Sequence, residues 1–154
     1  MDKKGEVRSI ARNKKALFRF QLIDELEAGI SLVGTEVKSL RGGNLSLQEA
    51  YVRIMDGELW LIGAHIPEYS HGNKLNHKPT RERKLLVHRR ELAKWDKQVK
   101  VKGVTMVPLE VYFKGSLVKV RVGLVRGKRI HDKRAEQRDK DDKRAIEQAM
   151  NRRR

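Results

Sequence analysis

The 154-residue sequence contains no cysteine, which excludes disulfide bonds and thiolate metal sites. Residues 1–20 carry charges throughout and lack an apolar core segment, so we expect no signal peptide. No apolar run is long enough to cross a bilayer, and no amphipathic helix carries bulky apolar anchors for a membrane surface. These absences predict a soluble, cytoplasmic protein with no membrane partner.

Motifs of catalysis and cofactor binding are missing as well. The sequence has neither a Gly-x-Ser-x-Gly elbow nor a glycine-rich phosphate loop ending in Gly-Lys-Ser/Thr. The carboxylates of Asp24 and Glu25 are sequence neighbours without a partner for acid–base work. His71 and His77 share one segment, but no third ligand follows at a metal-binding spacing. We therefore expect no enzymatic activity, no metal and no cofactor, with a small nuclease using Glu and His as the enzyme alternative.

What the chain does have is positive charge. It holds 36 Lys and Arg against 20 Asp and Glu, a formal net charge of +16. Residues 126–154 carry 12 basic and 6 acidic side chains and almost nothing apolar, while residues 1–125 hold the other 24 basic and 14 acidic ones. Such a charge favours a phosphate-rich partner that contacts both parts, and it favours a monomer.

The sequence thus predicts two units: a domain over residues 1–125 and a basic tail over residues 126–154. Ordering the tail costs about 1–2 kcal/mol of backbone entropy per residue, which a partner must supply. Glu136 with Lys140 and Asp139 with Lys143 are helical pairs in the favourable order. A helix polar almost all round is unstable alone, so we expect the tail to be disordered when free and helical when bound.

Alternation of apolar and polar residues predicts strands along much of the first unit. The predicted strands cover residues 17–22, 30–40, 51–55, 58–62, 105–113 and 117–125. Asp56-Gly57 between two of them is a strong hairpin signal, and Lys114 to Ser116 joins the last two. The segment 30–40 follows Gly29 and contains Gly34, which indicates a strand that bends at a barrel corner.

Fewer segments look helical. Residues 44–50 predict a short helical turn with Ser46 as its N-cap, and residues 84–101 predict a helix stopped by Gly103. Residues 1–12 are expected to be loose, and residues 67–80 to form a long surface loop. About six antiparallel strands with one to three short helices predict a mainly β fold, a closed barrel of the oligonucleotide-binding type. A small open α+β sheet is the alternative.

Basic residues cluster at the ends of the predicted elements, as expected of a surface that follows phosphates. The clusters are Asn13-Lys14-Lys15, Lys38 with Arg41, Arg81 with Arg83 and Lys84, His88-Arg89-Arg90, and Lys119 with Arg121. The acidic Glu27 and Glu36 admit a structural interpretation, in which each pairs with a nearby Lys or Arg. In the tail, His131 could stack on a base or donate to a phosphate, or be an inert exposed side chain.

Several short motifs, taken together in order and spacing, match one family. They are NKKA at 13–16, EAG at 27–29, GTEVKSLR at 34–41, DGE at 56–58, PTRxRKLL at 79–86, KV at 119–120, GKR at 127–129 and HDKR at 131–134. In these motifs the chain resembles the SmpB family, the SsrA-binding proteins of bacteria, along nearly its whole length. One departure is Phe18-Arg19-Phe20, where the family often has His, an acidic residue and Tyr.

The resemblance implies an oligonucleotide-binding-type barrel that binds the tRNA-like domain of transfer-messenger RNA and escorts it to stalled ribosomes. It implies RNA contacts at Glu27, Leu86 and Lys119, and along Asn13, Lys14 and Lys15. The basic clusters add Lys38, Arg41, Arg83 and Lys84 to the candidate RNA-binding residues. The family's tail engages the ribosomal decoding site and messenger channel, where it replaces a codon–anticodon pair. The matching tail residues are Lys128, Arg129, His131, Asp132, Lys133 and Arg134.

A generic basic barrel protein, such as a ribosomal or assembly protein that binds structured RNA, is the main alternative to this function. It would tolerate removal of the tail. A nuclease would instead cleave RNA and lose that activity when a carboxylate or histidine is replaced.

Overall fold

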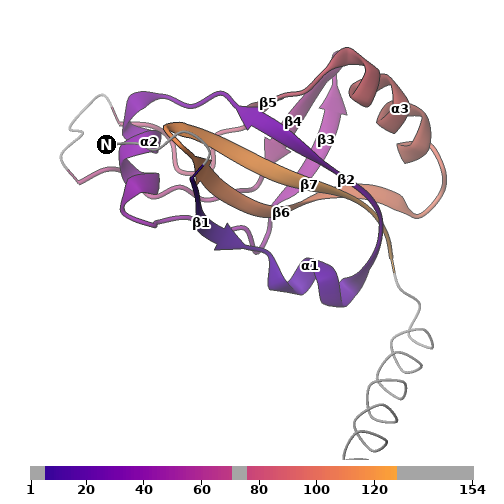
Figure 1. Cartoon of the computed structure of the whole chain (residues 1–154), viewed down its shortest axis with the longest axis horizontal. Coiled ribbons are helices and arrows are strands. Elements are labelled where there is room, and N and C mark those ends of the chain that lie inside the picture. The colour runs from indigo at the N-terminus through magenta and orange to yellow at the C-terminus, as the bar shows by residue number, and fades with distance from the viewer. Residues whose placement is uncertain (1–5, 71–75, 128–154) are drawn as a thin grey trace, which may run out of the picture.

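The computed structural model describes residues 6–70 and 76–127 (Figure 1). Along the chain the elements are β1 Val7–Arg12, α1 Lys14–Arg19, β2 Phe20–Ile30, α2 Gly34–Arg41, β3 Tyr51–Met55, β4 Glu58–Ile62, β5 Arg83–Leu86, α3 Arg89–Val99, β6 Val104–Lys114 and β7 Leu117–Gly127. The predicted tail residues from Lys128 onward lie outside the described residues. Within the described ranges, no helix is long and apolar enough to span a membrane.

The strands close into a ring. In residues 6–70 and 76–127, hydrogen bonding runs from β6 through β3, β4, β5, β2 and β7 and back to β6, and every pairing is antiparallel. Two strands pair with the same edge of β6: β3 pairs near Met106, and β1 pairs along residues 110–114. The predicted mainly β, closed barrel is therefore confirmed, with β1 added outside the ring.

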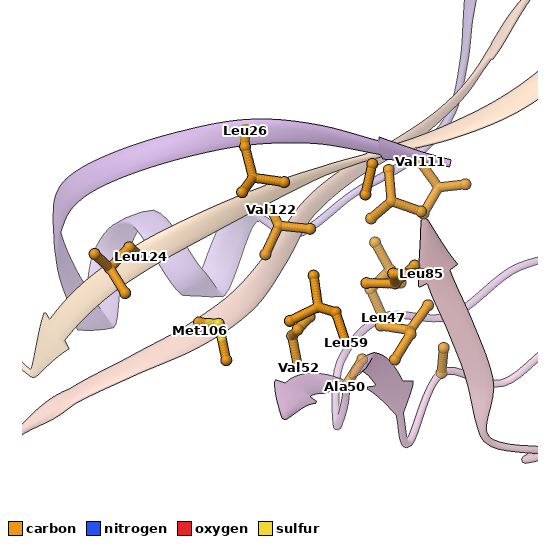
Figure 2. Close-up of a cluster of buried hydrophobic side chains, with 14 of the residues drawn as sticks. Leu26, Leu47, Ala50, Val52, Leu59, Leu85, Met106, Val111, Val122 and Leu124 are labelled. Atoms are coloured by element: carbon orange, nitrogen blue, oxygen red, sulfur yellow. The ribbon is translucent and has the colours of Figure 1, made fainter. Parts of the chain in front are cut away.

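Alternation along β7 decides which side chains face the barrel interior. Val120 and Val122 are buried, whereas Arg121 between them is exposed. They join a core of small and branched side chains, and Figure 2 shows leucines and valines from facing strands meeting inside the ring. The core side chains fix the register of β7, because a one-residue slip would place Arg121 inside.

The predicted hairpin is confirmed. Strands β3 and β4 pair from Tyr51↔Ile62 to Met55↔Glu58, which leaves Asp56 and Gly57 as a two-residue turn. Both have positive φ, 52° and 71°, the conformation of a type I′ turn that suits the twist of paired strands. The final pair of strands is also confirmed, and β7 extends to Gly127.

The long strand predicted over residues 30–40 is wrong, because residues 34–41 form helix α2. Its buried residues Glu36, Ser39 and Leu40 recur at helical spacing, and Gly42 and Gly43 end it. The β-branched Thr35 and Val37 gave this segment a strand-like appearance. The helix is held by buried contacts from distant segments, which local propensity does not reveal.

The predictions near the N-terminus also need correction. Residues 7–12, expected to be loose, form strand β1 because a long edge of β6 is available to pair with them. Residues 14–19 form helix α1, so the predicted strand begins only at Phe20. Asn13 caps that helix by accepting a hydrogen bond from the Ala16 N–H at 3.3 Å.

Two predicted helical segments differ from the structure as well. Residues 83–86 form strand β5 between β4 and β2, so the predicted helix begins only at Arg89. Ser46 pairs with His65 in an isolated antiparallel bridge rather than capping a helix. In both places, hydrogen bonds to distant residues replace the local helical ones.

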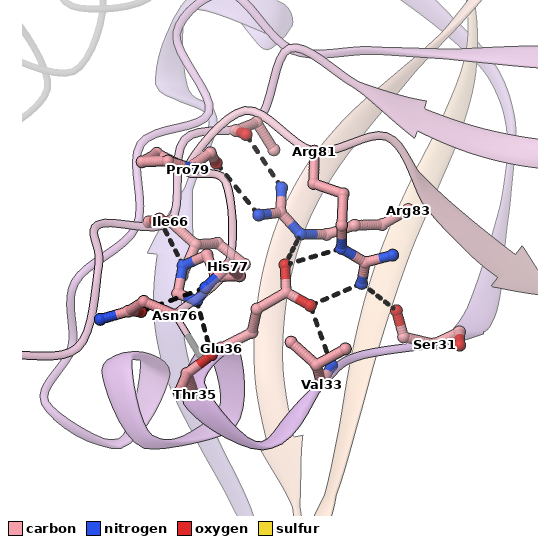
Figure 3. A network of polar contacts seen from close by, with 11 residues as sticks. Ser31, Val33, Thr35, Glu36, Ile66, Asn76, His77, Pro79, Arg81 and Arg83 are labelled. Atoms are coloured by element: carbon pink, nitrogen blue, oxygen red, sulfur yellow. Dashed lines mark hydrogen bonds and ion pairs between the residues drawn. The ribbon is translucent and has the colours of Figure 1, made fainter. Parts of the chain in front are cut away.

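A buried ion-pair network holds α2 against the loop before β5 (Figure 3). The carboxylate of Glu36 is fully buried and accepts hydrogen bonds from Arg81, from Arg83 and from the Val33 N–H. Arg83 is also fully buried, and it donates to the carbonyls of Ala64 and Pro79, each at 3.0 Å. Every ionised group of the pair is thus hydrogen-bonded, as burial of charge requires.

His77 closes the network on its other side (Figure 3). Its Nε2 lies 2.8 Å from the carbonyl of Ile66, and its Nδ1 lies 2.9 Å from the hydroxyl of Thr35. The carbonyl can only accept, so Nε2 carries the proton and donates it to Ile66, while the contact between Nδ1 and Thr35 joins α2 to the loop.

Burial alone raises the pKa of Glu36, but the hydrogen bonds from Arg81, Val33 and Arg83 outweigh it and hold the pKa below its ordinary 4.5. Burial also lowers the pKa of Arg83, and Glu36 partly offsets this effect. Since the folded-state pKa of Glu36 is depressed, its contribution to stability is present above pH 4.5 and is lost as pH falls through the folded-state value.

We predict that Glu36→Gln lowers the free energy of unfolding by about 3–5 kcal/mol at pH 7, because Arg83 keeps a buried, uncompensated charge. Urea unfolding at pH 7 and at low pH measures this loss, which should shrink as pH falls. Asp96→Asn is the matched control: its pair with Lys100 at 3.8 Å is exposed, so we expect a loss below about 0.5 kcal/mol. Equal losses in the two variants would contradict the assignment.

Candidate nucleic-acid interface

One row of residues crosses four strands on the outer face of the barrel. The register pairs Leu86 of β5 with Gly29 of β2, Gly29 with Lys119 of β7, and Lys119 with Tyr112 of β6. Leu86 is 52% exposed, and a Cβ on Gly29 would lie only 3.3 Å from that of Leu86. A side chain here would crowd Leu86, so glycine suits this position between Leu86 and Lys119.

Glu27 lies next to this row, paired across the strands with Arg121. Its carboxylate accepts a hydrogen bond from the Tyr112 hydroxyl and forms an ion pair with Lys114 at 3.3 Å. The Tyr112 hydrogen bond lowers the pKa of Glu27, burial opposes it, and Lys114 and Lys119 lower it further. Conversely, burial and the Glu27 carboxylate raise the pKa of Tyr112. The site therefore holds a fixed carboxylate beside Lys119.

A second carboxylate orders the neighbouring cations. Glu110 accepts from Ser9 at 2.8 Å and pairs with Arg12 at 2.9 Å and Arg121 at 3.1 Å. Burial raises the pKa of Glu110, but these three partners outweigh it and lower the pKa overall. Arg121 also lies over the Tyr112 ring at 5.6 Å. The guanidinium groups thus have defined positions on the surface.

We name the outer face of β2, β7 and β6, together with Leu86, the charged face. It brings together Glu27, Leu86 and Lys119, which only the family resemblance had connected. The described chain adds Tyr112, Lys114 and Glu110 to it, which the sequence reasoning missed. Period-two alternation along residues 110–114 could have placed these three on one side of a strand.

The structure separates Arg83 from Lys84. Lys84 points outward from β5 and pairs with Glu58 at 2.8 Å, so it remains a surface cation. Arg83 points inward and is fully buried in its pair with Glu36. The expectation that Arg83 contacts RNA conflicts with this burial. Successive side chains of a strand point to opposite faces, so only one of Arg83 and Lys84 can face outward.

Lys38 and Arg41 lie on helix α2, at the end of the barrel opposite α3 (Figure 1), rather than at the end of a strand. The Lys38 ammonium lies 5.6 Å from the centre of the Tyr69 ring, and both basic side chains are in exposed residues. They are available at the surface but apart from the row of Gly29 and Lys119.

The Asn13-Lys14-Lys15 cluster divides into a structural and a surface part. The Asn13 amide donates to the Pro108 carbonyl at 2.9 Å while its oxygen caps α1, so the fold uses both ends of this side chain. Lys14 and Lys15 are exposed on α1. Lys15 lines a groove with Arg19 and Tyr51 and with Thr105 and Val107 of β6, apart from the row of Gly29 and Lys119.

These features define a class: a basic, closed barrel of the oligonucleotide-binding type. The family model described as SmpB protein matches residues 10–152, and the chain belongs to the SmpB family. It is 48% identical to the SsrA-binding protein of Carboxydothermus hydrogenoformans over 92% of this chain and 95% of that one. It is 47% identical to the SsrA-binding protein of Gloeothece citriformis over 96% of each.

A solved structure gives the same result in three dimensions. The chain matches one from the structure described as "tmRNA-SmpB: a journey to the center of the bacterial ribosome" with a TM-score of 0.65 and 42% identity. The match covers 80% of this chain and 91% of that chain. The resemblance seen in the sequence motifs is therefore confirmed at the level of the family and the fold.

We predict that Tyr112→Phe raises the pKa of Glu27 toward 4.5, because the hydroxyl that stabilises the carboxylate is removed. A carbon-detected NMR titration of the Glu27 carboxyl measures the change. Lys114→Ala serves as a comparison and should also raise the pKa of Glu27, because its ion pair with Lys114 at 3.3 Å is lost. An unchanged Glu27 titration in Tyr112→Phe would contradict this arrangement.

Proposed function

We propose that this chain binds the tRNA-like domain of transfer-messenger RNA through the charged face and delivers it to stalled ribosomes for trans-translation. The observation that carries the proposal is the row joining Leu86, Gly29 and Lys119 beside Glu27. The relatives of this chain are named SsrA-binding proteins. In this row the barrel register fixes the positions of an exposed apolar side chain, Leu86, and of a lysine, Lys119.

Physical chemistry supports a recognition of RNA shape by this face. Folded RNA displays phosphates, 2′-hydroxyls and unstacked bases, which cations, carboxylates and apolar side chains can contact respectively. Because Glu27 and Glu110 stay ionised, they hold Lys114 and Arg121 in place and also repel misplaced phosphates. A face with both signs of charge favours one spatial pattern of phosphates over a uniform duplex.

The proposed RNA contacts on the barrel are the outward-facing members of the predicted set. They are Glu27, Leu86 and Lys119 on the charged face, and Lys14, Lys15, Lys38, Arg41 and Lys84 outside it. Asn13 has a structural part in this proposal as the cap that orients Lys14 and Lys15. The barrel itself makes and breaks no bond.

For the tail, we propose that residues 128–134 enter the decoding site and the following segment becomes helical in the messenger channel, replacing a codon–anticodon pair. The support is the family match, which extends to residue 152, and the basic composition of residues 126–154. Ribosomal RNA would supply the free energy that orders such a segment.

The experiment that tests the proposal measures binding of the full chain to the tRNA-like domain, to ordinary tRNA and to a plain RNA duplex across a salt series. We expect binding to the tRNA-like domain to survive salt that removes the duplex. Equal affinities that fall together with salt would identify a non-specific basic protein and reject the proposal.

We predict that Lys119→Ala weakens binding to the tRNA-like domain by about tenfold, because a positioned contact in the centre of the face is lost. Lys102→Ala, in an exposed turn after α3, removes the same charge and should change affinity by less than about twofold. Equal weakening by both variants would mean that the charged face has no special part in binding.

We also predict that ending the chain after Arg126 preserves RNA binding but abolishes engagement of the ribosome. Filter binding of the tRNA-like domain and co-sedimentation with stalled ribosomes measure the two activities separately. Loss of RNA binding in the truncated chain would overturn this division between barrel and tail.

A further inference from the structure

A second outward-facing row crosses β3, β4 and β5, with an aromatic ring at its centre. The register pairs Arg53 of β3 with Trp60 of β4, and Trp60 with Lys84 of β5. Trp60 is partly exposed, and its ring N–H donates to the Met55 carbonyl at 3.3 Å. This hydrogen bond restrains the indole on the outer surface, between two cations.

A second aromatic side chain continues the same row of side chains. Tyr51 precedes Arg53 by two residues on β3, so both point outward, and Tyr51 is 43% exposed. Because Tyr51 pairs with Ile62, it stands diagonal to Trp60, about 7–8 Å away by Cα positions. Tyr51 also lines the groove that contains Lys15 and Arg19 of α1. The surface formed by Tyr51, Arg53, Trp60 and Lys84 is named the aromatic face.

The aromatic face meets the charged face along β5, where Lys84 and Leu86 lie two residues apart, but Trp60 itself lies across the barrel from Lys119. In the ring of strands, β4 is three steps from β7 in either direction, so Trp60 and Lys119 project from opposite sides. A ligand bound at Lys119 therefore leaves Trp60 accessible. The carboxylate Glu58 is paired with Lys84, while Arg53, Lys15 and Arg19 supply further positive charge at this side.

We propose that the aromatic face binds single-stranded RNA, with unpaired bases stacked on Trp60 and Tyr51 and the backbone phosphates held by Arg53 and the α1 cations. Aromatic side chains on adjacent strands, flanked by cations, are the arrangement by which β-sheet surfaces bind unstacked bases. A duplex is excluded from this contact because its bases are already stacked. Trp60, Tyr51 and Arg53, which carry this inference, are not among the contacts proposed for the tRNA-like domain.

The two tryptophans of the chain make a direct test possible. Trp95 is only 2% exposed and donates to Asp24 at 3.2 Å, so an added oligonucleotide reaches only Trp60. We expect oligouridylate and oligoadenylate of about ten nucleotides to quench the fluorescence of the full chain. Trp60→Phe should remove the quenchable emission. A base-paired RNA hairpin of equal charge should quench little.

Affinity measurements complete the test. We expect Trp60→Leu and Arg53→Ala each to weaken binding of a labelled single strand by about tenfold, while binding of the tRNA-like domain is unchanged. Lys119→Ala should leave the quenching intact. Absent quenching, equal quenching by the hairpin, or loss of quenching in Lys119→Ala would each overturn the inference.

Discussion

The pairing of β7 on both edges is the constraint on which the rest of this structure depends. Along its length β7 is hydrogen-bonded to β6 on one side and to β2 on the other, so the ring closes through it. Because both registers are fixed, the direction of each β7 side chain is fixed too. Val120 and Val122 point inward, and Lys119 and Arg121 point outward. The same hydrogen bonds thus build the core and place the cations of the charged face.

Three ionised glutamates then fix the positions of basic side chains on this framework. Glu36 is buried with Arg83 and fixes α2 and its loop, whereas Glu27 and Glu110 order the lysines and arginines outside the barrel. For all three, hydrogen bonds and neighbouring cations lower the pKa against the effect of burial. The chain has a large excess of positive charge, and these carboxylates decide which cations are held by the fold and which remain available to a partner.

Much of the β framework could be predicted from the sequence, because hairpins are local. Asp56-Gly57 and the alternation along residues 105–125 each reflect contacts between neighbours in the chain, and those strands are confirmed. Strand β1, strand β5 and helix α2 could not be predicted, because their partners are distant: β1 needs the free edge of β6, β5 fits between β4 and β2, and α2 is held through Glu36 by the loop before β5. The motifs identified the family correctly, but they gave Arg83 and Lys84 the same role.

The sequence by itself determined the family, the closed mainly β fold and the excess of positive charge, since motif order, alternation and composition are all properties of the chain alone. Only the tertiary structure decided which charges serve the fold and which face outward. Arg83 and Lys84 are adjacent and both basic, yet the pleat sends one into a buried pair with Glu36 and the other to the surface. Strand registers that join distant residues place Tyr112 beside Glu27 and Trp60 between two cations. No local sequence pattern encodes such registers.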